Sequence, residues 1–271
     1  MGRTATTRGR IIAALVLPLA LPLVPGLAST AAAQPLVLNG RLIDGTGAAP
    51  VEKGRVVVSD GRIACAGPVA ACPVPAGAEV INAGEGSIIP GLIDLHAHPR
   101  PQYFGWFLAS GVTTVRSANT SLDQVKALQA LPAPRAELVW AGPMLDGEAS
   151  IIRRFFDEPA EGQLSPARPA DGPSLDGIEL LIAQTPEQAI AAVDALAAQG
   201  ADWVKLYEQM PPEAFAAAAR RAREKGLPVM ADLGMASTRG LKAAQVDLLQ
   251  ATTAGVDSLE HASGAALAYQ R

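Results

Sequence analysis

The sequence predicts an α/β protein, in which a (β/α)8-type TIM barrel that is incomplete, with six strands present, follows a small N-terminal β-sandwich portion. Two patterns support this prediction. Residues 36–89 contain short strands separated by turn residues, whereas later residues alternate β-branched runs with helix-like segments that end at a glycine. Strands that alternate with helices of this length form a parallel sheet that closes, or begins to close, as a barrel.

The chain begins with the pattern of a secretory signal peptide. Three arginines precede an apolar run over 11–24, and alanines at 31–33 offer the small residues that a signal peptidase requires. A membrane anchor is the alternative, but the run is shorter than the roughly 20 residues of a spanning helix and contains two prolines. We therefore expect residues 1–33 to be removed and the mature protein, from Gln34, to be periplasmic or secreted without a stable membrane anchor.

Residues 34–89 form the predicted β-sandwich portion, which we expect to be a scaffold without chemistry. Asp60 and Gly61 separate two β-branched runs, and a D-G pair in that setting favours a hairpin turn. Cys65 and Cys72 are the only cysteines, and an exported chain meets an oxidising compartment. A disulfide that closes a small loop and two free thiols both remain open. The expected strands are 36–42, 55–59, 62–66 and 79–82.

Residues 90–271 form the predicted partial barrel. One helix is marked clearly: Thr185 is placed as N-cap, Pro186 as first helical residue and Gln188 for a capping box, and this helix should end near Gln199. Glycines at 111, 200, 226 and 255 are expected to end helices and precede strands. The six expected barrel strands are 92–95, 112–116, 137–141, 203–207, 228–232 and 256–261.

The segment 143–184 interrupts this alternation and is predicted to be an irregular insertion loop. It contains five prolines between Gly142 and Thr185 and is longer than an ordinary connection. Because it follows the third strand, it should lie on the catalytic face of the barrel. Arg153 and Arg154 could bind an anionic substrate group there, or they could be ordinary solvated side chains.

The composition is that of a soluble globular enzyme. Hydrophobic residues make up 49% of the chain and charged residues 18%, and the net charge is −4. There is no excess of basic residues, so a nucleic-acid partner is not favoured.

The chain has only three histidines, and two of them are placed together. His96 and His98 lie two positions apart at the end of an apolar run, so that they project from the same face of a strand and could bind one metal ion. His261 ends another expected strand. The alternative is that His96 and His98 are ordinary polar residues at a strand end.

The segment from Pro90 to His98 resembles the signature of the amidohydrolase superfamily, in which a first barrel strand ends in H-x-H. The segments Asp202–Tyr207 and Gly255–His261 occur in the order and spacing of that superfamily, and together the three are similar to its imidazolonepropionase-like and prolidase-like branch. The resemblance covers the chain from about Leu36 to its last residue. It implies a metal-dependent hydrolase of C–N bonds in amides, cyclic amides or dipeptides, with a metal hydroxide as the nucleophile.

The resemblance also implies a set of site residues. Lys205 would be the catalytic residue, carboxylated by carbon dioxide and bridging two metals, and Tyr207, on the same face, would contact the substrate. We expect Zn²⁺, as one or two divalent ions, because zinc accepts imidazole and carboxylate ligands and lowers the pKa of a bound water. The expected metal ligands are His96, His98, Lys205, Asp232 and His261.

Two of these residues have alternative interpretations. A lysine that is buried between apolar residues favours its neutral amine, but Lys205 could instead extend to solvent from the strand end. Asp232 stands where the resembled enzymes typically have a histidine, which should alter the affinity for metal. Asp232 could also be only a capping or turn residue.

The resemblance is incomplete at the end of the chain. Residues 91–271 number 181, whereas a complete barrel has about 250. We therefore expect two strands to be missing, including the eighth, which in the resembled family supplies an aspartate that binds metal and shuttles the proton. A truncated, non-catalytic remnant or binding protein of the same fold is the alternative function. The sequence leaves a homo-oligomer open as well.

Overall fold

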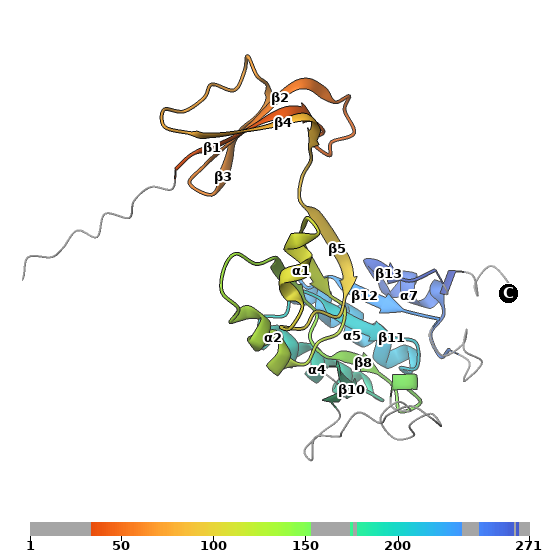
Figure 1. The fold of residues 1–271 in the computed structure, drawn as a ribbon. Helices are drawn as coiled ribbons and strands as arrows, with labels where there is room; N and C mark the ends of the chain where they lie inside the picture. Colours follow the sequence, from red (N-terminus) through yellow and green to blue (C-terminus); the bar gives the residue numbers. More distant parts are fainter. Residues whose placement is uncertain (1–33, 153–173, 176–177, 235–243, 263, 266–271) are drawn as a thin grey trace, which may run out of the picture. The chain divides into compact units, whose positions relative to one another are not determined.

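The computed structural model describes residues 34–152, 174–175, 178–234, 244–262 and 264–265 (Figure 1). The chain divides into two units, Met1–Ile89 and Pro90–Arg271. The predicted signal peptide lies outside the described residues, as do Arg153 and Arg154. Within the described ranges, no helix is both long and apolar enough to cross a membrane.

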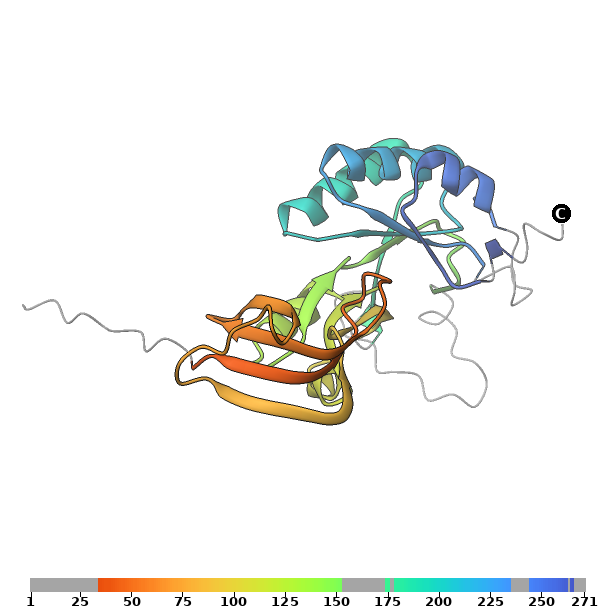
Figure 2. The same ribbon diagram turned by 90° about the horizontal axis from the view of Figure 1, so that it is seen from above.

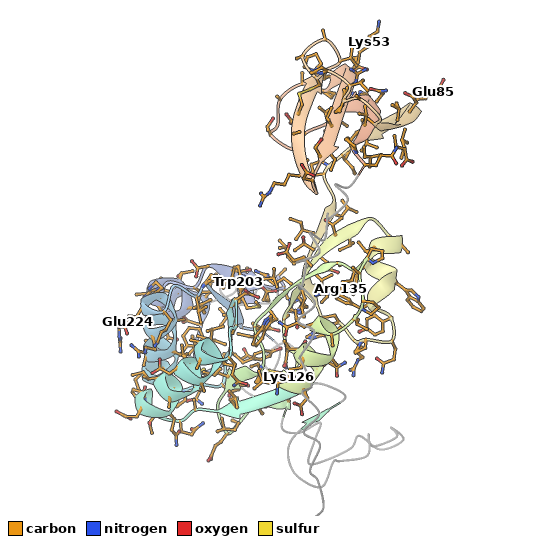
Figure 3. All side chains as sticks on the ribbon, turned by 90° about the vertical axis from the view of Figure 1, so that its left-hand side faces the viewer. Lys53, Glu85, Lys126, Arg135, Trp203 and Glu224 are labelled. Carbon is orange, nitrogen blue, oxygen red and sulfur yellow. A yellow bond between two sulfur atoms is a disulfide. The ribbon has the colours of Figure 1, made fainter. Side chains whose placement is uncertain are left out.

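The first unit contains one four-stranded sheet with the order β3-β2-β1-β4. Strand β1 pairs antiparallel with β2 and parallel with β4, and β2 pairs antiparallel with β3. A second sheet, which a β-sandwich requires, is not found among the described residues of this unit, so the sandwich stays a prediction. Figure 3 shows the side chains of Lys53 and Glu85 extending away from the sheet. The strands are β1 (Leu36–Leu42), β2 (Val51–Ser59), β3 (Arg62–Pro68) and β4 (Glu79–Ile88).

Local chemistry explains the turn and the cross-link of this sheet. Asp60 and Gly61 have φ of 51° and 70°, so both residues of the β2–β3 turn lie in the left-handed region, as the predicted hairpin requires. Cys65 and Cys72 form a disulfide, which settles the alternative that the sequence leaves open. Cys72 packs with Val37 and Val57 in a small apolar cluster.

The second unit contains two sheets of mostly parallel strands. One has the order β5-β6-β7, and the other has the order β13-β12-β11-β8-β10-β9. The backbone N–H groups of Asp202 and Trp203 both donate to the carbonyl of Trp140, which joins the end of β7 to the start of β11. The strands are β5 (Leu92–Ala97), β6 (Val112–Ser117), β7 (Glu137–Trp140), β8 (Met144–Asp146), β9 (Ser174–Leu175), β10 (Ile178–Ile182), β11 (Val204–Tyr207), β12 (Val229–Asp232) and β13 (Ser258–Glu260).

Helices connect the strands and cover one face of the larger sheet, where α4, α5 and α7 lie together (Figure 2). The predicted start of α4 is confirmed, because the Thr185 side chain accepts a hydrogen bond from the backbone N–H of Gln188 and Pro186 is the first helical residue. Phe215 of α5 is buried in the core beneath these helices. The helices are α1 (Phe104–Ala109), α2 (Leu122–Gln129), α4 (Pro186–Ala198), α5 (Pro212–Glu224) and α7 (Leu248–Ala254).

The prediction that 143–184 is an irregular loop is wrong at both ends of that segment. Met144–Asp146 forms β8 and Ile178–Ile182 forms β10, and these two strands pair in parallel with Leu180 opposite Met144. The predicted count of six strands is therefore too low. A three-residue strand after a proline is too short to show a periodic pattern, and β10 is stabilised by a partner more than 30 residues away in the sequence.

The two outermost parallel strands of the unit lie close to each other. Strand β5 is one edge of the smaller sheet and β13 is one edge of the larger sheet, yet His96 of β5 contacts Glu260 of β13 (Figure 1). The edges of the two sheets therefore approach each other at these residues. Leu92, Ile93 and Leu95 of β5 remain at least half exposed, which leaves apolar surface at this edge.

Candidate functional site

Four of the five predicted metal ligands lie at or near the carboxyl ends of parallel strands, and the fifth lies within one. His96 lies within β5 and His98 just after it, Lys205 lies in β11, Asp232 ends β12, and His261 follows β13. Because the strand ends meet at one edge of the curved unit, residues that are 165 positions apart come into contact. The ring centroids of His96 and His98 are 5.4 Å apart, and those of His96 and His261 are 4.4 Å apart.

His96 and His98 are each held through the same ring nitrogen. Nδ1 of His96 contacts the carboxylate of Glu260, and Nδ1 of His98 lies 3.3 Å from the backbone carbonyl of Asn119. The backbone N–H of His96 also donates to Oδ1 of Asp94 at 3.0 Å. Metal-binding histidines typically donate one ring N–H to a carboxylate or a carbonyl and bind metal with the other nitrogen. Both rings have that arrangement.

Lys205 is fully buried, and its Nζ has no hydrogen-bond partner among the described residues. Desolvation by burial lowers its pKa from 10.5 to about 8, although the negative charges of Asp232 and Glu260 act in the opposite direction. The alternative that Lys205 extends to solvent is therefore wrong, because β11 is enclosed on both faces. A buried amine of this kind is neutral more often than an ordinary lysine.

Asp232 is also fully buried, and neither carboxylate oxygen has a hydrogen-bond partner in the described part of the chain. Nε2 of His261 lies 3.6 Å from Oδ2 of Asp232. The side chain therefore caps no helix or turn among these residues. His261 has a φ of 65° and a half-exposed side chain, so it turns out of β13 in the left-handed region.

Tyr207 is the residue predicted to contact the substrate, and the structure places it in a buried apolar cluster. Its side chain is buried and packs with Met144, Ile151, Ile152 and Leu180, and Nζ of Lys205 lies 5.2 Å from the ring centroid. Burial and the nearby carboxylate of Asp232 raise the pKa of its phenol. The ring therefore stays neutral and forms part of the packing beneath the strand ends.

The motif reasoning missed two functional candidates, Arg116 and Glu260. Nη2 of Arg116 lies 2.7 Å from Oε1 of Glu260, and both side chains are buried. Glu260 immediately precedes His261 within the segment Gly255–His261, so the sequence could have indicated it as a candidate. The sequence could not indicate its contact with His96, because that contact depends on the tertiary arrangement of β5 and β13.

These residues partly fit a divalent metal. Among the described residues there is no group of three or more His, Cys, Asp or Glu side chains close enough together to hold an ion. However, a buried carboxylate without a partner, beside two imidazoles with Nδ1 engaged, belongs to the donor set that zinc accepts, and the buried amine of Lys205 would add an oxygen donor after carboxylation. His96, His98, Lys205, Asp232 and His261 are therefore the residues that would hold it.

Comparison by sequence gives no relatives. No protein-family model matches the chain, and no curated protein is significantly similar to it in sequence.

Comparison of structures does give relatives. The structure is similar to molinate hydrolase (TM-score 0.67, 19% identity), to an A. niger ochratoxinase (TM-score 0.63, 20% identity) and to a Xaa-Pro dipeptidase (TM-score 0.61, 19% identity). The matches cover 84–85% of this chain but only 58–61% of those chains. All three are amidohydrolase-superfamily proteins. The chain therefore shares the fold of these solved structures.

Proposed function

We propose that this chain is part of an exported, metal-dependent amidohydrolase that hydrolyses C–N bonds in amides, cyclic amides or dipeptides. The observation that supports this most directly is the shared arrangement of His96 and His98, whose Nδ1 atoms face a carboxylate and a carbonyl. That arrangement leaves each Nε2 available as a ligand. One or two divalent ions, of which Zn²⁺ fits this donor set, would polarise the scissile carbonyl and lower the pKa of a bound water.

Lys205 would take part as an anionic ligand after modification. Its neutral amine can add to the carbon of CO₂ and lose one proton, which gives a carbamate with two oxygen donors. Burial favours this reaction because it lowers the pKa of Lys205 to about 8 and thereby raises the fraction of neutral amine at neutral pH. Nζ of Lys205 lies 5.2 Å from the centroid of the Tyr207 ring, and the side chain of His261 is half-exposed.

The second unit would be part of a larger barrel. The contact between His96 of β5 and Glu260 of β13 supports this proposal, and a further strand would cover the apolar residues exposed on β5. The chain spans 58–61% of the structures named above.

The substrate class comes from the printed names of the structural relatives, which include a dipeptidase and hydrolases of small molecules. We propose a small-molecule amide or a dipeptide as the substrate. We propose no nucleic-acid partner, because the chain has no basic excess. Secretion would place the Cys65–Cys72 disulfide in an oxidising compartment, where such bonds persist.

A non-catalytic binding protein of the same fold is the second candidate. It is favoured by the absence, within the described residues, of three clustered His, Cys, Asp or Glu side chains. A protein of this kind would bind an amide or a peptide at the strand ends without hydrolysing it.

Metal analysis tests the proposal. Purified protein should contain zinc or a similar ion after dialysis, and His96→Ala combined with His98→Ala should remove it. The matched control is Asp123→Ala with Lys126→Ala, an exposed pair on α2. Unchanged metal content in the histidine variant would contradict the metal site.

Hydrolysis separates the two candidates. Release of free amino acid from a dipeptide or an N-acyl amino acid, stopped by a chelator, would support the hydrolase. Binding of the same compounds without any release would support the non-catalytic alternative.

A further inference from the structure

Side chains from three strands contact the carboxylate of Glu260. Oε1 accepts hydrogen bonds from Nη2 of Arg116 at 2.7 Å and from Oγ of Ser258 at 2.7 Å, and Oε2 contacts Nδ1 of His96. The carboxylate is therefore fixed at both oxygens. It connects β5, β6 and β13 within the interior of the second unit.

Arg116 fixes this carboxylate and the strand that carries His96 at the same time. Its Nε donates to the backbone carbonyl of Leu95 at 2.6 Å, while its Nη2 also lies 3.2 Å from Oγ of Ser258. The guanidinium stacks on the ring of Trp203, a residue labelled in Figure 3, at 4.5 Å from the ring centroid. The planar guanidinium of an arginine can make these contacts together, whereas the single ammonium group of a lysine cannot.

The contact with Glu260 determines where the proton of His96 lies. The carboxylate of Glu260 forms a buried ion pair with the guanidinium of Arg116 at 2.7 Å, and it also accepts a hydrogen bond from Oγ of Ser258 at 2.7 Å, so its geometry is that of an ionised carboxylate. An ionised carboxylate only accepts hydrogen bonds, so Nδ1 must be the protonated nitrogen of His96. When the ring is neutral, its Nε2 then has a free lone pair.

We propose that Glu260, fixed by Arg116, is a positioning residue that holds His96 in the tautomer with hydrogen on Nδ1 and aims its Nε2 at the metal position. This inference rests on the metal site of the proposed function. It differs from a purely structural link between strands, because only a positioning residue is expected to change zinc affinity in protein that remains folded.

The ¹⁵N chemical shifts of the imidazoles in metal-free protein test this directly. Wild-type protein should show His96 with hydrogen on Nδ1, and Glu260→Gln should abolish this preference, since the amide must also present an NH₂ group to Arg116 or His96. His98 is an internal reference, because its Nδ1 faces the carbonyl of Asn119 and should not change. A wild-type His96 with hydrogen on Nε2 would overturn the proposal.

Zinc affinity, measured by competition with a chelator, gives a second readout. Glu260→Gln should weaken zinc binding by about 10- to 100-fold, the usual effect of losing such a partner. Arg116→Lys should weaken it by a smaller factor. Glu137→Gln is the control, because Glu137 is an exposed acid at the first position of β7, and it should leave the zinc affinity unchanged. Wild-type affinity in Glu260→Gln, or an equal loss in the control, would refute the role.

The two tests separate the inference from the proposed function. Wild-type protein that shows the expected tautomer but binds no metal would refute the metal site and leave the positioning of His96 intact. Protein that binds zinc through His96 without the tautomer preference would refute the positioning alone. If Glu260→Gln does not fold, the ¹⁵N spectrum of the wild type and the zinc affinity of Arg116→Lys still test whether Glu260 positions His96.

Discussion

Replacing Lys205 by Met should stabilise the metal-free protein at neutral pH. The lysine is fully buried, and burial lowers its pKa from 10.5 to about 8 even though Asp232 attracts the ammonium. One pKa unit corresponds to about 1.4 kcal/mol, so keeping this group charged in the folded state costs about 3 kcal/mol at pH 7. Methionine has a similar length and no charge, and it adapts to irregular packing. Lys205→Met should therefore raise the free energy of unfolding by about 3 kcal/mol.

The pH dependence of this difference has a definite sign. The folded-state pKa lies below the unfolded one, so between pH 8 and pH 10.5 the folded protein has lost a proton that the unfolded chain retains. The free energy of unfolding rises with pH wherever the unfolded state binds more protons than the folded state. The wild type therefore gains stability across this pH window. The advantage of Lys205→Met should fall below about 1 kcal/mol at pH 10.

Urea denaturation of chelator-treated protein at pH 7 and pH 10 measures both values. Lys126→Met, at an exposed position on α2, is the matched control and should change stability by no more than about 0.5 kcal/mol at either pH. An unstabilised Lys205→Met at pH 7, or the same gain at both pH values, would show that burial of the amine does not have the energetic effect argued here.

Three further predictions concern export, metal affinity and the core. Mass spectrometry of secreted protein should find an N-terminus at or within a few residues of Gln34, and an intact Met1 on secreted material would count against the signal peptide. Asp232→His should tighten zinc binding in chelator competition, because it adds an imidazole ligand; unchanged binding would remove this position from the site. Phe215→Ala should lower the free energy of unfolding in urea by about 3–5 kcal/mol, because the ring is 1% exposed in the core. A loss below 1 kcal/mol would contradict that packing.

The sequence by itself determined the features that depend on neighbouring residues. Thr185 and Pro186 start α4 because the cap needs only the hydroxyl and the amide three residues later. Asp60 and Gly61 form a turn because both tolerate positive φ. The order of the three motifs likewise predicted the fold that the structural relatives share. The alternation of strands and helices can be recognised from local sequence patterns, so this part of the prediction did not depend on distant contacts.

Only the tertiary structure decided how distant groups meet. The pairing of β8 with β10 and the bond between Cys65 and Cys72 each depend on chain closure that no local pattern specifies. Likewise, the sequence gives no reason for Glu260 to contact His96, 164 residues away, until the strands curve and bring β13 to β5. The burial of Lys205 and Asp232 without partners has the same origin, because desolvation is set by every element that packs around a side chain.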